Sequence, residues 1–160
     1  MEGKIVRTWD VSEMLQLRYI EIASDTIIRG VFARIFIPNK TLVEDCPVIP
    51  LYASENTARI NAVRSYAYNW RMKDENGELI VRYALAMGMG SIYNHAASGN
   101  IGNWNYKSEF RMEFWSLRDI KANEELTHDY GWGKYAGTRL NAVDRFLRPI
   151  KKSNLRRLGD

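Results

Sequence analysis

The stretch that decides the fold is residues 88–100, which read Gly-Met-Gly-Ser-Ile-Tyr-Asn-His-Ala-Ala-Ser-Gly-Asn. Its small residues let the backbone approach another segment or a ligand closely, and they surround the polar pair Asn94-His95. A second stretch, residues 123–131, reads Asn-Glu-Glu-Leu-Thr-His-Asp-Tyr-Gly and ends a short predicted strand with Tyr130 before a glycine. Taken singly, neither indicates a function, because a loop histidine or a core tyrosine more often satisfies local hydrogen bonds.

Around these stretches, the pattern of apolar residues predicts a mostly β domain with few, short helices. Strands are expected at residues 19–22, 26–37 (two pieces with a bend at Arg29-Gly30), 41–48 (ended by prolines), 110–117 and 125–130. The runs 66–72 and 78–85 flank an Asn-Gly pair and predict a hairpin. Helices are expected at residues 10–17, capped by Asp10 or Ser12, and at 138–147, whereas 53–63 fits either a helix or a loop.

The composition is that of one ordinary globular domain. The 160 residues are 46% hydrophobic and 26% charged, which is enough to form a real core. A net charge of +4 permits binding to nucleic acid or an acidic surface without requiring it. The single cysteine, Cys46, excludes an internal disulfide and favours an intracellular setting, cytoplasmic or nuclear. No apolar run approaches the roughly 20 residues of a membrane span, so no membrane association is expected.

Several common kinds of site are missing from the sequence. Two histidines and one cysteine are too few for a closed structural zinc site of four such ligands, so no metal site is predicted. There is no P-loop or dinucleotide-binding fingerprint. No serine has the surroundings of a nucleophile elbow.

Taken together and in order, the two stretches resemble the signature of SET-domain protein-lysine methyltransferases. That family reads roughly as a glycine-containing turn before a Val-Phe-Ala-like strand, then Gly-x-Gly and Asn-His-Ser-x-x-Pro-Asn, then Glu-Glu-Leu-Thr-x-Asp-Tyr-Gly. This chain offers residues 29–33 (Arg-Gly-Val-Phe-Ala), then 88–100, then 124–131. The layout is most similar to that of the minimal virus-encoded or bacterial members, which lack a zinc-binding C-terminal segment.

The resemblance covers about residues 18–135, which are therefore expected to be the SET domain. It implies a β-clip-like fold of several small sheets with a knot-like threading of the C-terminal part. Residues 1–17 are then an N-terminal extension, helical by the pattern above. Residues 136–160 are a basic C-terminal helix or tail.

The resemblance also implies an S-adenosylmethionine-dependent enzyme that methylates the side-chain amine of a protein lysine, in a histone tail or another protein. Such a transfer needs a neutral amine aligned with the sulfonium in a dry channel. By position, the residues carried over as catalytic are Tyr130 and, with less support because Tyr68 is nearby, Tyr66. The cofactor-binding residues carried over are Arg29, Gly30, Val31, Phe32, Asn94, His95, Tyr130 and Trp132. The substrate channel is expected to involve Tyr66, His128 and Tyr135.

Three departures from the family pattern keep other functions open. Ala96 replaces the usual serine, Gly99 the usual proline, and His128 the usual aromatic or β-branched residue. One alternative is therefore a catalytically silent SET-like binding module. Another is a nucleic-acid- or chromatin-associated protein that binds through the basic residues at 145–157. A channel without a zinc-binding segment needs another closure, such as residues 132–147 or a second subunit, which leaves a homodimer open.

Overall fold

The computed structural model describes residues 3–24, 26–54, 63 and 66–131, and the backbone of 145–146 and 150–151. The chain divides into two compact units. Unit 1 comprises residues 1–41, 93–102 and 116–160, and unit 2 comprises residues 42–92 and 103–115. Strands dominate the described part of both units, which confirms the predicted mostly β fold.

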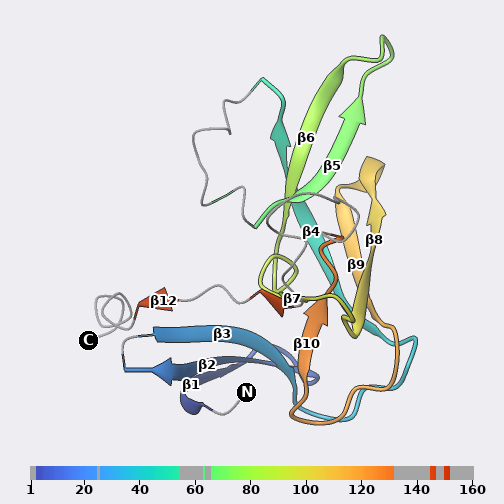
Figure 1. The fold of residues 1–160 in the computed structure, drawn as a ribbon. Helices are drawn as coiled ribbons and strands as arrows, with labels where there is room; N and C mark the ends of the chain where they lie inside the picture. The colour runs from blue at the N-terminus through green and yellow to red at the C-terminus, as the bar shows by residue number, and fades with distance from the viewer. Residues whose placement is uncertain are drawn as a thin grey trace. The chain divides into compact units, whose positions relative to one another are not determined.

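Unit 1 is organised around a short central strand that pairs with segments from distant parts of the sequence (Figure 1). Its strands are β1 (Lys4–Asp10), β2 (Leu15–Ala23), β3 (Thr26–Ala33), β7 (Asn94–Ala96), the start of β8 (Ile101–Tyr106), β10 (Glu125–His128), β11 (Arg145–Phe146) and β12 (Ile150–Lys151). The order β1-β2-β3-β10 is antiparallel, and β10 also runs parallel to β7. Strand β10 therefore pairs with the 29–33 segment through its first half and with the Asn94-His95 pair through its second half.

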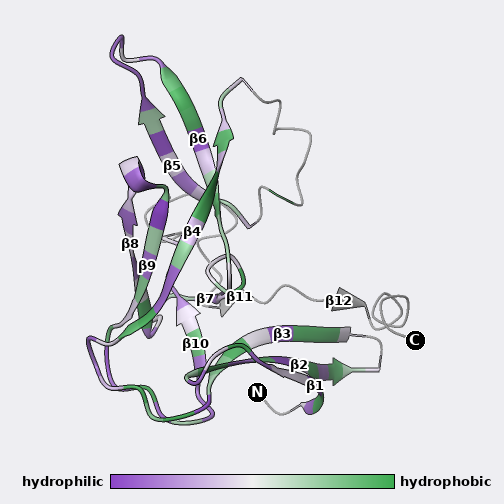
Figure 2. Cartoon of the chain, turned by 180° about the vertical axis from the view of Figure 1, so that it is seen from behind, coloured by the Kyte–Doolittle hydropathy of each residue, from purple (hydrophilic) through white to green (hydrophobic). Residues whose placement is uncertain are grey.

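The core of unit 1 explains this arrangement. Leu15, Ile27, Val31 and Leu126 are at most 2% exposed, and they come from the strands β2, β3 and β10. Hydrophobic residues dominate β3 (Figure 2), as expected for a strand with neighbours on both edges. Beyond the strands, Ile37 pairs with Ile120 in an isolated bridge that ties the two connecting loops together.

Unit 2 is a second antiparallel arrangement. Its strands follow the order β8-β9-β4-β6-β5, with β4 (Leu42–Tyr52), β5 (Tyr68–Lys73), β6 (Leu79–Ala86) and β9 (Arg111–Ser116). The predicted hairpin is confirmed as β5 and β6, and its turn is held by Asp74, which accepts hydrogen bonds from the backbone N–H groups of Asn76 and Glu78. A 3-10 turn at Lys107–Glu109 joins β8 to β9. The fully buried ring of Trp70 is part of this unit's core.

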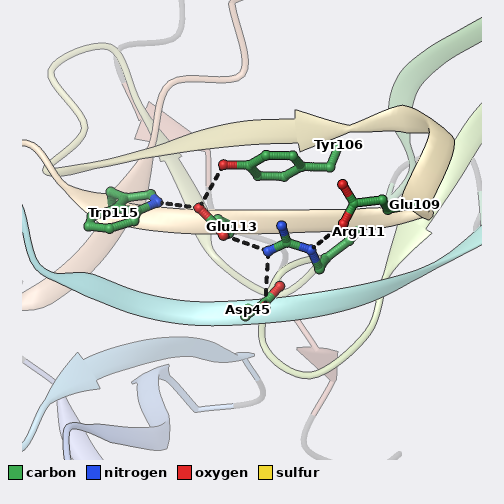
Figure 3. A network of polar contacts seen from close by, with 6 residues as sticks. All are labelled: Asp45, Tyr106, Glu109, Arg111, Glu113 and Trp115. Carbon is green, nitrogen blue, oxygen red and sulfur yellow. Dashed lines mark hydrogen bonds and ion pairs between the residues drawn. The ribbon is translucent and has the colours of Figure 1, made fainter.

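A charged network lies on the outward face of β9 (Figure 3). Its members are Asp45, Tyr106, Glu109, Arg111, Glu113 and Trp115. The Arg111 guanidinium contacts three carboxylates and stacks over the Tyr106 ring at 4.1 Å. The hydrogen bond from Arg111, followed by that from Trp115, lowers the pKa of Glu113. Because Arg111 of β9 binds Asp45 of β4 as well as Glu113 of its own strand, the network joins β4 to β9.

The helix predicted over residues 10–17 is wrong. Residues 4–10 and 15–23 are strands, and the tight turn between them is held by the Ser12 hydroxyl, which accepts from the backbone N–H groups of Met14 and Leu15. Ser12 does cap a turn, but no helix follows it. The sequence after Ser12 instead alternates in period two, and this favours pairing with β3.

Two further strand boundaries also differ from the expectation. Strand β3 runs without a bend through Arg29 and Gly30, which pair directly with β2. Strand β4 continues through Pro47 and Pro50 to Tyr52, because its first half pairs with β9 and its second half with β6. A strand with one open edge tolerates a residue that lacks an N–H group.

The remaining helix predictions fall mostly outside the described residues. This holds for 53–63 and for most of 138–147, although residues 145–146 form strand β11 and so do not continue a helix. Any knot-like threading by the segment after Gly131 lies outside the described part as well. Within the described part, no helix is long and apolar enough to cross a membrane.

Candidate functional site

The site is built in unit 1, where β10 pairs with both β3 and β7. Asn94, at 2% exposure, begins β7 and pairs with Thr127 of β10. Its side-chain nitrogen donates to the carbonyl oxygen of Arg29 at 2.7 Å and to Glu125 Oε1 at 2.8 Å. Both partners are acceptors, so the amide cannot flip without placing oxygen against oxygen. Among the described residues, none donates a hydrogen bond to the remaining Oδ1 atom.

Gly30 lies in β3 directly against this amide and its carboxylate partner. A Cβ atom at Gly30 would lie 2.6 Å from Glu125 Oε1 and 3.1 Å from the Phe32 ring. A side chain at position 30 would therefore have to displace the Glu125 carboxylate from this place. Of the neighbouring residues, Val31 has its side chain fully buried in the core, and the Phe32 ring packs under the Arg18 guanidinium at 4.6 Å.

His95 fixes the end of β10. Its Nδ1 atom accepts a hydrogen bond of 3.0 Å from the backbone N–H of Tyr130. A nitrogen that accepts carries no proton, so its 3.8 Å contact with Asp129 is not an ion pair. The Tyr130 hydroxyl donates in turn to the carbonyl oxygen of Tyr93, and its ring centroid lies 5.1 Å from that of His95. Both ends of Tyr130 are thus held by the Asn-His segment.

His128 is the next side chain beside Tyr130. It is 7% exposed, and its ring centroid lies 5.9 Å from that of Tyr130. Burial lowers the pKa of His128 to about 4, and this outweighs the opposing effect of Asp129. The imidazole is therefore uncharged at neutral pH.

The loop after the Asn-His pair packs directly on β10. Asn100, at 1% exposure, accepts from the Thr127 N–H at 2.9 Å and donates to the Glu125 carbonyl oxygen at 2.8 Å. A Cβ atom at Gly99 would lie 2.7 Å from the Thr127 carbonyl oxygen and 2.8 Å from the Asp129 nitrogen. Gly99 therefore meets a packing requirement at the position where the family pattern has proline.

The family model named SET domain matches residues 28–131. The chain belongs to the SET domain family. A curated relative, the histone-lysine N-methyltransferase specific for lysine 37 of histone H3 from Schizosaccharomyces pombe, is 32% identical over 108 residues. That match covers 64% of this chain and 66% of the relative, so the chain spans slightly less than two thirds of its length.

Solved structures with similar folds come from two further organisms. One is a Plasmodium falciparum protein described as a candidate histone methyltransferase, with 22% identity, a TM-score of 0.49, and coverage of 64% of this chain and 87% of that one. Another is a humanized mutant of Chaetomium thermophilum Polycomb Repressive Complex 2, with 28% identity, a TM-score of 0.43, and coverage of 64% and 13%. Scores this low add nothing to the family assignment.

The other SET site residues expected from the sequence belong to unit 2 or lie outside the described residues. Tyr66 precedes β5 in unit 2, where its backbone N–H donates to the Val63 carbonyl oxygen. Its neighbour Tyr68 donates its hydroxyl to the Gly90 carbonyl oxygen at 2.6 Å, so that hydroxyl stabilises the glycine turn of unit 2. Trp132 and Tyr135 lie outside the described residues.

Glu125 and Asn100 were not expected as parts of the SET site. Both carry sequence signals, since Glu125 is the second of two adjacent glutamates and Asn100 ends the first motif. Their partners are 31 and 27 residues away, so the hydrogen bonds themselves could not be inferred from spacing. They border a pocket of about 310 Å³, lined by Ala96, Ser98, Asn100, Arg118, Glu124, Glu125 and Thr127. The described residues contain no cluster of three or more metal-ligating side chains.

Proposed function

We propose that this SET domain transfers a methyl group from S-adenosylmethionine to the side-chain amine of a protein lysine. The observation that carries the proposal is the Asn94 amide, which is fixed between the Arg29 carbonyl and Glu125 with its Oδ1 atom as the remaining acceptor. The yeast relative is named for its action on histone H3, so a histone tail is the first substrate to test. A nuclear location belongs to the same proposal.

The residues present fit the amino-acid end of the cofactor. An ammonium group needs acceptors, and Asn94 Oδ1 supplies one beside the carboxylate of Glu125. Arg29, Gly30, Asn94 and His95 would hold the cofactor, with Phe32 at the edge and Val31 contributing backbone only, because its side chain is in the core. When bound, the cofactor supplies an electrophilic methyl group on a sulfonium.

Tyr130 is the residue proposed to act at the reacting atoms. Because its hydroxyl proton is donated to the Tyr93 carbonyl oxygen, the phenolic oxygen is oriented as an acceptor. An acceptor of this kind can stabilise the positive charge around a methyl sulfonium. The hydrogen bond from Tyr130 N to His95 fixes the backbone from which the ring projects.

The uncharged state of His128 suits the same chemistry. The transfer handles two cationic groups, the sulfonium and the lysine ammonium that must lose its proton. An imidazolium beside Tyr130 would repel both, and burial prevents it at neutral pH by lowering the pKa of His128. The number of methyl groups added is a separate property that this position is proposed to influence.

Replacing Tyr130 by Phe tests the catalytic role. Methyl transfer to a histone H3 peptide, followed by mass spectrometry with isotopically labelled cofactor, should fall about 100-fold, as when one positioned polar group is removed from an active site. Cofactor binding and the urea midpoint should change little. Tyr106→Phe is the matched control, because it removes an exposed tyrosine hydroxyl whose hydrogen bond, within the described part of the chain, goes to Glu113. Full activity of the Tyr130 variant would overturn its assignment.

The same function includes proposed roles for three further aromatic residues, for the basic C-terminal residues and for a second subunit. Tyr66 is proposed as a second channel tyrosine, and Trp132 with Tyr135 as an aromatic lid that suits a cationic substrate. Nucleic-acid binding through residues 145–157 predicts an affinity that falls steeply with salt. Closure by a second subunit predicts a dimer in sedimentation.

A further inference from the structure

Two adjacent glutamates, Glu124 just before β10 and Glu125 at its start, have different partners. Glu124 accepts from the Arg118 guanidinium at 2.5 Å and from the Lys121 backbone N–H at 2.9 Å, so it stabilises the turn before the strand. These contacts lower the pKa of Glu124, with the hydrogen bond from Arg118 as the largest cause. Glu125 instead accepts from the Asn94 side chain. The division follows from their positions, because Glu124 closes the turn and Glu125 begins the strand.

Glu125 lies against both of the segments that hold the proposed cofactor-binding residues, the 29–33 segment and β7. Its Oε1 atom lies 2.8 Å from Asn94 Nδ2 and 2.6 Å from the position where a Gly30 Cβ would be. The same residue pairs with Phe32 across the β3–β10 ladder, so its backbone is fixed relative to the 29–33 segment. One carboxylate thus connects the glycine of β3 to the asparagine of β7.

We propose that Glu125 is a positioning residue for the amino-acid end of the cofactor. Its carboxylate fixes the Asn94 amide so that Oδ1 accepts from the ligand's ammonium group, and it places negative charge beside that ammonium. This inference rests on the proposed function. It adds a ligand-selective role for Glu125, because only ligands that carry the amino-acid end should depend on it.

Three ligands separate this role from a structural one. S-adenosylmethionine carries the amino-acid end and a sulfonium, S-adenosylhomocysteine carries the amino-acid end and a neutral thioether, and methylthioadenosine carries the neutral thioether alone. Binding of each is measured by calorimetry, or by competition where affinity is weak. In Glu125→Met, which removes the acceptor and the charge, affinity for the first two should fall about 30-fold while methylthioadenosine affinity stays the same. Glu125→Gln keeps an acceptor oxygen and should lose only about threefold.

The neighbouring Glu124 offers matched control variants. Glu124→Met and Glu124→Gln remove the neighbouring carboxylate and should change all three affinities by one common factor, whatever they do to stability. If wild-type protein binds S-adenosylmethionine but Glu125→Met binds it equally well, the positioning role is wrong and the proposed function survives. If Glu125→Met weakens all three ligands alike, Glu125 is structural only. If wild-type protein binds none of them, the proposed function itself fails.

Should Glu125→Met not fold, Asn94→Ser provides the second test. A double-mutant cycle with Glu125→Gln then measures whether the two side chains act through one contact. The expected result is coupling, seen as a smaller effect of Glu125→Gln on S-adenosylmethionine affinity in the Asn94→Ser background. Additive effects would overturn the inference.

Discussion

Replacing His128 by Phe should remove most of a specific acid sensitivity of the folded chain. Burial lowers the pKa of His128 from 6.5 to about 4, so the unfolded chain takes up a proton at a pH where the folded chain does not. The free energy of unfolding is therefore highest above pH 6.5 and falls as the pH drops toward 4. A shift of this size corresponds to about 3 kcal/mol at full protonation, and to about 2 kcal/mol between pH 7 and pH 5.

Urea unfolding of both proteins at pH 7, 6 and 5 isolates this contribution. All other titrating groups are shared, so the difference in unfolding free energy between variant and wild type should grow by about 2 kcal/mol in favour of the variant as the pH falls from 7 to 5. Phe is the chosen replacement because the site already holds an aromatic ring and burial favours an apolar one. His128→Leu serves as a second variant should Phe prove too large for the site.

NMR titration of the imidazole groups gives an independent measurement. The chain has only two histidines, so the spectrum of His128→Phe assigns both. The His128 ring should stay neutral down to about pH 5 and titrate near pH 4. A His128 that titrates near 6.5, or a variant whose stability follows the wild type at every pH, would refute the account of a buried neutral imidazole beside Tyr130.

Two changes in the loop that packs on β10 should destabilise the domain, as measured by urea unfolding at pH 7. Gly99→Ala places a methyl group within 2.7 Å of the Thr127 carbonyl oxygen and should cost about 1–3 kcal/mol; unchanged stability would mean that the loop can move away. Asn100→Ala leaves the Thr127 N–H and the Glu125 carbonyl without their partner and should cost about 2–4 kcal/mol, whereas Asn100→Asp, which still accepts from Thr127, should cost less.

Secondary structure could be predicted from the sequence where the residues that determine it lie within one short segment. The Asn-Gly pair at 76–77 predicted the β5–β6 hairpin, and alternation predicted β9. Ser12 misled, because a hydroxyl that accepts from backbone N–H groups two and three residues later occurs both in helix caps and in tight turns. Only the pairing of the following residues with β3 distinguishes the two.

Gly30 shows why part of the site could not be predicted from residues adjacent in the sequence. A glycine after an arginine suggested a bend, yet this glycine lies in an unbroken strand. The reason is a carboxylate 95 positions later, since Glu125 fills the space that a Cβ would need. The order of the motifs placed Asn94, His95 and Tyr130 in one group, but the atoms that orient them come from long-range pairing of β10 with β3 and β7.

The departures from the family pattern are compatible with this geometry. A side chain at position 99 would clash with the backbone of β10. Glycine, which lacks the ring of the family's proline, therefore lets this loop pack tightly on the strand. Burial lowers the pKa of His128 and keeps its imidazole uncharged at neutral pH, so it adds no positive charge beside Tyr130. The hydrogen bonds that hold Asn94 and Tyr130 involve neither Ala96 nor His128. These substitutions therefore give no structural reason to prefer a silent binding module over an enzyme, and the methyl-transfer assay on the wild-type protein separates the two.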